Sequence, residues 1–317
     1  MSERSGEHAR IARLLDRLHS VPGRLRVANG DDAAVFAPSS EPLVATVDVS
    51  VEGVHFRRSF ASLDVLGRRA AMGAASDLAA MGARPTGLLI ALVLPSATSD
   101  AELEALMAGI DQAAIELDAV VAGGNLSAGD QLSITTTALG HLPGEALTRA
   151  GARPGDGIFV TAPPGHAALG LESLLRDATP PGIEPYREAW LAPIAAIDAG
   201  LALAGRAHAC IDVSDGLVQD LGHVCRASEC GATLELPADE DFERVAASLG
   251  VEGSRLRFAG GESYGLLFAA PDACGVDAVR VGTIEAEPGI RWRDGDAVRE
   301  LDASLGFDHF TEGTSDG

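Results

Sequence analysis

Apolar residues in the first half of the chain follow two different periodicities. Runs of apolar or β-branched residues bounded by turn residues predict three strands, over residues 43–49, 86–94 and 131–142. Alanine and leucine at helical spacing predict a long buried helix over 63–83 and a second helix over 99–117. Ser99 followed by Glu102 is a capping-box pattern, which predicts that the second helix begins there. The first half is therefore expected to mix helices and strands.

A second series of elements begins after residues 149–157 (RAGARPGDG), where glycine and proline concentrate. The pattern beyond this segment predicts helices over residues 166–176, 185–203 and 215–227 and strands into Ile211 and near Thr233, Leu266 and Val279. We therefore predict two domains that mix helices and strands, an N-terminal one over 1–145 and a C-terminal one over 146–317.

Composition and charge narrow the class of protein. With 317 residues, 46% of them hydrophobic, the chain is long enough for two ordinary cores. A net charge of -22 argues against nucleic acid or an anionic membrane as a partner, because both need a cationic face. No run approaches the roughly 20 apolar residues of a membrane span. The four cysteines lack CxxC spacing, so we expect reduced packing thiols in a cytoplasmic protein.

The chain contains no lysine, since all 24 of its Lys+Arg residues are arginine. This excludes the P-loop lysine, the β3 lysine of protein kinases and any Schiff-base lysine. An enzyme that uses ATP on this sequence must hold phosphates with metals, arginine and backbone N–H groups.

Six acidic residues sit in short motifs that contain glycine or serine. They are Asp31 and Asp32 in GDDAAV, Asp48 in TVDVSVEGVHF, Asp77 in SDLAAMGA, and Asp212 and Asp215 in IDVSDGL. Taken singly, each is typical of a turn former or a helix cap. Together they predict a cage for Mg²⁺ and a polyphosphate, because Mg²⁺ requires oxygen ligands and is usually shared with substrate phosphates.

Two motifs carry a more local expectation. In IDVSDGL a strand delivers Asp212 at its end, Ser214 is placed to cap the following helix, and the N–H groups there are expected to face a phosphate. In AVVAGGNLS the glycines 123–124 are expected to let the backbone approach a phosphate closely. His55, next to Phe56, is by itself more typical of a packed residue than of a catalytic one.

Read in order, the motifs are GDDAAV, TVDVSVEGVHF, SDLAAMGARP, GGNLS, RAGARPGDGIFVT, IDVSDGL, GGESYGLLF and GFDHF, between residues 30 and 310. This series resembles the thiamine-monophosphate kinase family, a branch of the aminoimidazole ribonucleotide synthetase-like superfamily. The resemblance implies two α+β domains and a homodimer in which the N-terminal sheets of two subunits form a barrel. It also implies ATP and thiamine monophosphate as substrates and Mg²⁺ as cofactor.

The resemblance assigns roles to residues by motif match. The implied Mg²⁺ ligands are Asp31, Thr46, Asp48, Asp77, Asp212 and Asp215, with Asp32 nearby. Among them, the implied catalytic acids are Asp48, Asp77 and Asp212. The implied ATP contacts are Gly124, Asn125, Arg149 and Ser214, and the implied contacts to thiamine phosphate are His55, Glu262 and Phe307.

Five positions depart from the family pattern and leave two alternatives open. Aspartate is replaced by Asn125, threonine by Val47, asparagine by Ala75, and two acids by Ser263 and Gly265. One alternative is a sibling ATP-dependent enzyme with another acceptor, since positions 263 and 265 would leave room and remove charge. The other is a catalytically depleted homologue, since an amide at 125 loses a full charge.

Overall fold

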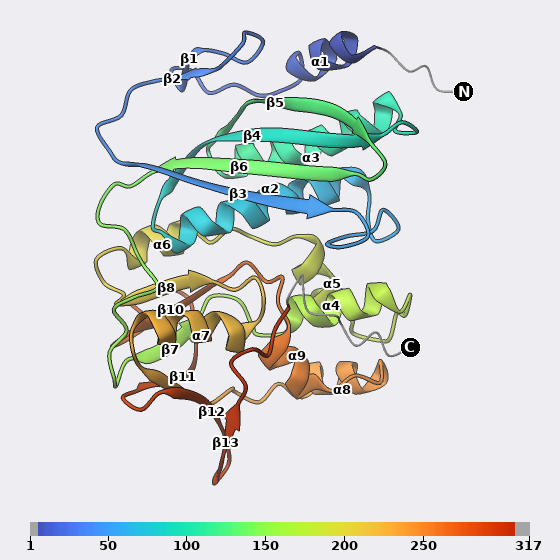
Figure 1. Ribbon diagram of the computed structural model, residues 1–317. Coiled ribbons are helices and arrows are strands. Elements are labelled where there is room, and N and C mark those ends of the chain that lie inside the picture. The colour runs from blue at the N-terminus through green and yellow to red at the C-terminus, as the bar shows by residue number, and fades with distance from the viewer. Residues whose placement is uncertain (1–5, 308–317) are drawn as a thin grey trace. The chain divides into compact units, whose positions relative to one another are not determined.

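The computed structural model describes residues 6–307 of the chain (Figure 1). The chain divides into two compact units. The first comprises Met1–Leu147 and Leu191–Gly205, and the second comprises Thr148–Trp190 and Arg206–Gly317. We predicted a single boundary near residue 145 and did not predict that residues 191–205 return to the first unit.

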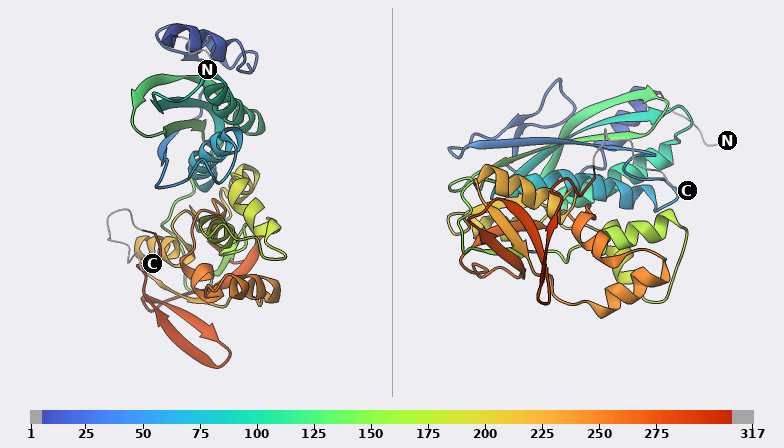
Figure 2. Two further views of the ribbon diagram at one scale, coloured as in Figure 1. Left: turned by 90° about the vertical axis from the view of Figure 1, so that its right-hand side faces the viewer. Right: turned by 60° about the horizontal axis from the view of Figure 1, so that its bottom comes forward.

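The first unit is built on a four-stranded sheet with the strand order β3-β6-β4-β5. These strands are β3 (Leu43–Val51), β4 (Arg84–Pro95), β5 (Val120–Gly129) and β6 (Ser133–His141). β6 pairs antiparallel with β3 and β4, and β4 pairs parallel with β5. Helices α2 (Leu63–Ala80) and α3 (Asp100–Glu116) lie on one face of this sheet (Figure 2). The predicted strands and helices of this half are confirmed.

Small residues let the two helices pack closely. A Cβ atom on Gly67 of α2 would lie 2.3 Å from the carbonyl oxygen of Leu106, and one on Gly109 of α3 would lie 1.8 Å from that of Asp64. The start of α3 has the predicted capping box, in which the Ser99 side chain accepts from the backbone of the third helical residue and that glutamate accepts from Ser99.

The other face of the sheet is apolar and exposed in the described chain. Val47 and Val49 on β3 are 60% and 48% exposed, and Leu89 and Val93 on β4 are 37% and 36% exposed. Single exposed apolar residues are common, but these four lie on the same face of β3 and β4, the two strands that flank β6. We call these four residues the open sheet face.

The first unit is completed by shorter elements. They are α1 (Glu7–Leu15), the two-stranded ladder of β1 (Leu25–Val27) and β2 (Val35–Phe36), and α6 (Ile197–Leu203). The prediction of one helix over 185–203 was wrong, because the chain breaks near Pro193 into α5 (Glu184–Leu191) and α6. α6 packs closely on α2, where a Cβ on Gly200 would lie 2.0 Å from the Ala79 carbonyl oxygen.

The second unit contains a seven-stranded sheet with the order β13-β12-β9-β11-β7-β10-β8. The strands are β7 (Gly157–Val160), β8 (Ala209–Asp212), β9 (Gly231–Leu234), β10 (Leu266–Ala270), β11 (Val279–Glu285), β12 (Gly289–Asp294) and β13 (Ala297–Leu301). The helices are α4 (His166–Leu175), α5 (Glu184–Leu191), α7 (Leu217–Ala227), α8 (Glu240–Ser248) and α9 (Gly253–Ala259).

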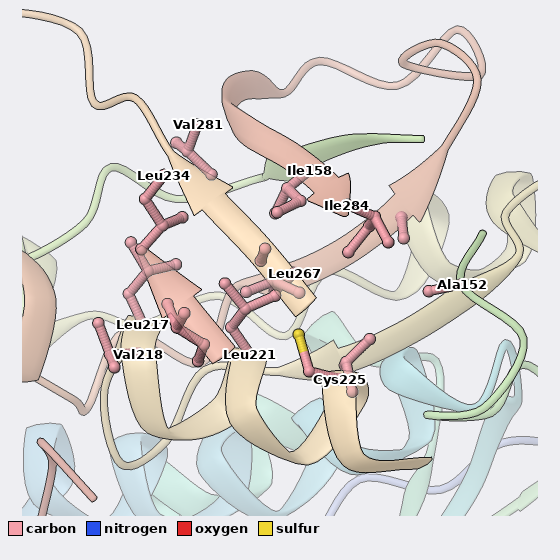
Figure 3. Close-up of a cluster of buried hydrophobic side chains, with 14 of the residues drawn as sticks. Ala152, Ile158, Leu217, Val218, Leu221, Cys225, Leu234, Leu267, Val281 and Ile284 are labelled. Atoms are coloured by element: carbon pink, nitrogen blue, oxygen red, sulfur yellow. The ribbon is translucent and has the colours of Figure 1, made fainter. Parts of the chain in front are cut away.

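Helix α7 forms the core of this unit with the sheet. Its residues Leu217, Leu221 and Cys225 share a buried cluster with Ile158 and Leu267 from the strands (Figure 3). Strands β8, β9 and β10, which contact α7, are buried at every position. The end of β8 and the start of α7, which carry the IDVSDGL motif, are therefore anchored on both sides.

The cysteines are free thiols, and three of them are buried, as expected for packing residues. Burial is the main cause that raises the pKa of Cys225, to about 12. Within residues 6–307, no helix is long and apolar enough to cross a membrane.

Candidate active site

The predicted site residues are divided between the two units. The first unit carries Asp31, Asp32, Thr46, Asp48, His55, Asp77, Gly124 and Asn125. The second unit carries Arg149, Asp212, Ser214, Asp215, Glu262 and Phe307.

In the first unit, β3 and α2 bring two distant motifs together. The hydroxyl of Thr46 on β3 donates a hydrogen bond of 2.5 Å to Oδ2 of Asp77 on α2. Asp48 stands two residues after Thr46 on the same strand, and side chains at that spacing share a face. The strand and the helix therefore present Thr46, Asp48 and Asp77 as a group of oxygen donors.

The loop with Asp31 and Asp32 is tied to β5. The Asn29 side-chain amide donates to the Val121 carbonyl at 2.9 Å, and Asn29 forms an isolated bridge with Asp31. Asp31 accepts the Asp32 N–H at 2.8 Å, and both aspartates are exposed. Asn29 thus connects this loop to the strand that also carries Asn125.

The packing of β5 on β4 gives a reason for glycine at position 124 that the sequence did not show. A Cβ atom there would lie 1.9 Å from the carbonyl oxygen of Ile90 on β4, whereas one on Gly123 would meet only a Leu89 methyl carbon at 3.6 Å. Gly124 is therefore required by the close approach of β4. That the same glycine also lets a phosphate approach the backbone stays a prediction.

Three of the departures from the family pattern occupy different environments. Val47 alternates with Thr46 and Asp48 on β3 and lies on the open sheet face. Ala75 is fully buried in α2. Asn125 is exposed on β5. Asn125 thus keeps a polar side chain at an exposed position, whereas Val47 places an apolar side chain at one.

His55 is fastened to the end of β3. Its ring Nδ1 accepts the backbone N–H of Val51 at 3.0 Å, and the backbone N–H of His55 donates to the Val51 carbonyl at 2.9 Å. A ring nitrogen that accepts a backbone N–H carries no proton, so the proton of the neutral ring is on Nε2.

In the second unit, one carboxylate organises the IDVSDGL loop. Oδ2 of Asp220 accepts the backbone N–H groups of Ser214, Asp215 and Gly216, each at 3.1 Å. Helix α7 begins at Leu217 with Gly216 as its N-cap, and no described side chain caps it. The predicted cap by Ser214 was wrong. The N–H groups expected to face a phosphate are instead used by Asp220.

The pKa of Asp220 reflects the negative charge around this loop. Its pKa is raised to about 7, first by burial and then by the charge of Asp215, with a smaller contribution from Asp212. Three carboxyl groups thus act on one another here. A cation near Asp212 and Asp215 would relieve this repulsion.

The donor chemistry of both units fits Mg²⁺, because carboxylate and hydroxyl oxygens are its preferred ligands. Among residues 6–307, however, no group of three or more His, Cys, Asp or Glu side chains is arranged to hold a metal ion. Small sets of acids fit an ion that keeps several waters and shares the phosphates of a substrate, rather than one held by protein alone.

The GGESYG segment docks on the same loop. The N–H of Glu262 donates to the Ser214 carbonyl at 2.8 Å, and that of Tyr264 donates to the Val213 carbonyl at 2.9 Å. A Cβ on Gly261 would lie 2.0 Å from the Ser214 carbonyl oxygen, so this contact requires glycine. The structure therefore brings Glu262 next to the loop of Asp212, Ser214 and Asp215.

The room expected beside Ser263 and Gly265 is absent from the structure. The Ser263 hydroxyl donates to the Val213 carbonyl at 3.2 Å. A Cβ on Gly265 would lie 2.6 Å from that of Ala162. The cavity lined by both residues has a volume of about 10 Å³, which is room for about one water. This cavity of the second unit is too small for an organic acceptor, and the choice of acceptor stays a prediction.

Phe307 reaches the loop from the end of the described chain. Its N–H donates to the Asp215 carbonyl at 3.0 Å, and the Gln219 amide bridges the Phe307 carbonyl and Asp215 Oδ2 at 3.0 and 3.2 Å. The ring is about half exposed. Asp308, His309 and Phe310 of the GFDHF motif lie outside the described residues.

Arg149 is exposed and lies near α7. The Ser228 hydroxyl donates to its carbonyl at 3.2 Å. The pKa of His223 is lowered by burial and by the charges of Arg226 and Arg149, while Asp215 acts in the opposite direction. Arg149 and Asp215 are thus both close enough to act on one residue of α7.

Sequence reasoning missed three residues that support the site. These are Asn29, Asp220 and Trp190, whose indole N–H donates to Glu262 Oε2 at 3.0 Å. For Asp220 a signal existed, because an acid in the first turn of a helix is a frequent acceptor for N–H groups at its start. For Asn29 and Trp190 the partners are too distant in sequence for any local pattern.

Comparison with known proteins identifies relatives along the whole chain. Residues 30–142 match the family model "AIR synthase related protein, N-terminal domain". The thiamine-monophosphate kinase of Escherichia coli (strain K12) is 36% identical over 324 residues, covering 96% of this chain and 98% of that protein. The thiamine-monophosphate kinase of Synechococcus elongatus is 35% identical over 310 residues, covering 89% and 91%.

Solved structures give the same picture. The thiamine monophosphate kinase from Aquifex aeolicus is 32% identical with a TM-score of 0.74, covering 81% of this chain and 90% of that one. AaThiL complexed with AMPPCP and TMP is 29% identical with a TM-score of 0.75, covering 95% and 100%. Hydrogenase maturation protein HypE, at 19% identity and a TM-score of 0.74 over 95% of both chains, shares the fold alone.

Proposed function

The chain belongs to the thiamine-monophosphate kinase family, and we propose that it transfers the terminal phosphoryl group of ATP to thiamine monophosphate, giving thiamine diphosphate and ADP. The similarity to these kinases over nearly the full chain carries this proposal. A relative in complex with AMPPCP and TMP supports both substrates. Reduced thiols and the acidic charge agree with a cytoplasmic location.

This phosphoryl transfer requires neutralisation of negative charge rather than a general base. A phosphate monoester has a second pKa of about 6, so the acceptor is already largely a dianion at neutral pH. Two anionic reactants must then be brought in line, and phosphoryl transfer depends on positioning and electrostatic stabilisation. Mg²⁺, when bound, would supply the neutralising charge between them.

Residues of both units would bind the metal and the nucleotide phosphates. In the first unit, Thr46, Asp48 and Asp77 would hold Mg²⁺, and the short Thr46–Asp77 hydrogen bond orients one carboxylate. In the second unit, Asp212 and Asp215 would do the same, and Arg149 would bind nucleotide phosphates. Since the chain has no lysine, arginine is the charged donor available for this purpose.

The active form is a homodimer that pairs the open sheet face of two subunits. Val47 and Val49 expose apolar side chains on one face of β3, and Leu89 and Val93 do so on the same face of β4, across β6. Burial of this face against a second copy would remove apolar area from water at about 25 cal/mol per Å². The valine at position 47, where the family has threonine, increases that apolar area.

The activity is tested by incubating purified protein with ATP, Mg²⁺ and thiamine monophosphate and separating the thiamine phosphates by chromatography. We expect thiamine diphosphate from the wild type and at least a hundredfold slower formation by Asp77→Asn and Asp212→Asn, as for loss of a group that neutralises transition-state charge. Asp64→Asn, an exposed acid at the start of the same helix as Asp77, is the matched control. Absence of product while the Escherichia coli enzyme works in the same buffer would reject the proposal.

A further inference from the structure

The Glu262 carboxylate is held at both of its oxygens. The Trp190 indole N–H donates to Oε2 at 3.0 Å, and the Tyr264 hydroxyl donates to Oε1 at 3.2 Å. Because the two donors approach different oxygens, they oppose rotation of the carboxylate about its terminal bond. Both donors are neutral, so these hydrogen bonds set its direction without supplying a counter-charge.

The backbone that carries this group is unusual. Glu262 and Tyr264 have φ values of +68° and +53°, the left-handed region that residues with a Cβ atom avoid. Hydrogen bonds to the carbonyls of Ser214 and Val213 hold the segment in this conformation. A bulky aromatic residue at positive φ is a strained feature, and such strain persists where the surroundings over-determine it, often at ligand sites.

Trp190 gives the second line of evidence. Its side chain is fully buried, so the N–H needs an internal partner. A backbone carbonyl would satisfy it at no cost in charge, yet the partner is the carboxylate of a residue next to the IDVSDGL loop. Core packing around Trp190 requires neither a carboxylate as its partner nor a strained turn at residues 262–264.

We propose that Trp190 and Tyr264 are positioning residues that orient Glu262 toward the organic part of the acceptor substrate, and so control the KM for the acceptor but not that for ATP. The inference rests on the proposed function and deepens it. A carboxylate repels the phosphates of ATP and of the acceptor, and it attracts a cationic or N–H-bearing heterocycle. Thiamine monophosphate carries both a thiazolium cation and an aminopyrimidine.

The chain offers matched controls, because it has only two tryptophans and two tyrosines. Trp292 packs against Phe258 with ring centroids 5.0 Å apart, and Tyr186 lies in a separate cluster of buried side chains. Trp292→Phe and Tyr186→Phe therefore make the same chemical changes as the test variants, away from Glu262.

Steady-state kinetics of Tyr264→Phe and Trp190→Phe test the proposal. Loss of one hydrogen bond to a charged group predicts a rise of about tenfold in the acceptor KM, with kcat and the KM for ATP within about twofold of wild type. The controls should leave both KM values unchanged. An unchanged acceptor KM in Tyr264→Phe, or a parallel rise of both KM values, overturns the proposal. Thermal unfolding shows whether Trp190→Phe is folded. If Trp190→Phe does not fold, Tyr264→Phe still tests the proposal, because the Tyr264 side chain is only half-buried.

A readout independent of turnover separates this proposal from the proposed function. In ¹⁵N-labelled protein the Trp292→Phe spectrum identifies the indole N–H signal of Trp190, which should move in Glu262→Gln. A signal that stays in place overturns the hydrogen bond itself. If the wild type forms no diphosphate, the proposed function fails, and the calorimetric Kd for thiamine monophosphate replaces KM. Equal Kd values for wild type and Tyr264→Phe would then overturn the positioning role.

Discussion

Replacing Gly124 by alanine separates two explanations of the glycine pair in GGNLS. If Gly124 serves the approach of a phosphate, alanine should weaken ATP binding and leave the fold intact. If it serves the packing of β4 on β5, alanine should destabilise the fold whether or not nucleotide is present. The adjacent Gly123 provides the matched control.

The structure sets the size of the effect. A Cβ on Gly124 would lie 1.9 Å from the carbonyl oxygen of Ile90 and 2.8 Å from its carbonyl carbon. The obstacle is backbone in a parallel ladder, so it cannot move as a flexible side chain would. Overpacking of this kind costs about 1–3 kcal/mol, and a clash with backbone belongs at the upper end. At about 2–4 °C per kcal/mol, we expect the Tm to fall by about 6–12 °C.

The control should behave in the opposite way. A Cβ on Gly123 meets only a methyl carbon at 3.6 Å, which is ordinary contact. Alanine in a strand also costs about 0.5–1 kcal/mol less than glycine, so the Tm of Gly123→Ala should equal or slightly exceed that of wild type. Thermal unfolding followed by circular dichroism without nucleotide measures both variants. A Gly124→Ala protein that melts like wild type but no longer binds ATP would refute the packing explanation.

Three further predictions address other parts of the structure. Asp220→Ala leaves three N–H groups without their acceptor and should lower the free energy of unfolding by denaturant by about 2–4 kcal/mol. Asp220→Asn keeps an acceptor oxygen and should lose about half as much stability. Equal losses in the two variants would contradict the role of that oxygen. Val47→Asp combined with Val49→Asp should convert the dimer to monomers in analytical ultracentrifugation, and a variant that stays dimeric would place the interface elsewhere. Asn125→Asp adds a charge worth up to roughly 4 kcal/mol at about 4 Å, so the Mg²⁺ concentration for half-maximal activity should fall at least tenfold; an unchanged value would place residue 125 away from the ion.

Elements set by local chemistry could be predicted from the sequence. The capping box at Ser99 and the strand through Asp48 depend on residues a few positions apart, and the structure has both. The break near Pro193 was missed although proline is a local signal, because the alanine-rich pattern on either side of it continues at helical spacing. The helical periodicity led to the prediction of one continuous helix, although Pro193 interrupts it.

Contacts between distant segments could not be predicted in the same way. The acids were recognised as a group from their chemistry, and the structure joins Thr46 to Asp77. The reason for glycine at 124 is an oxygen on β4, and the acceptor for the N–H of Ser214 is Asp220 rather than a ligand. In both cases the motif was recognised and its physical cause was assigned to a ligand, because the protein partner becomes visible only after folding.

The glycines of these motifs have a common function that bears on the departures from the family pattern. Gly124 and Gly261 each allow one backbone to lie against another, the first at β4 and the second at Ser214. The loops that carry the acids are therefore held by main-chain contacts and by Asp220, and only to a small extent by the side chains at 263 and 265. Positions 263 and 265 add to this support, since the Ser263 hydroxyl donates to the Val213 carbonyl and the Gly265 carbonyl accepts the Val213 N–H, next to Asp212. A side chain at 265 must displace Ala162, and loss of the Ser263 hydroxyl removes one contact to Val213. Variants at these two positions should therefore be compared with wild type in thermal stability as well as in the kinetic constants for the acceptor, so that a change in binding is separated from a change in shape.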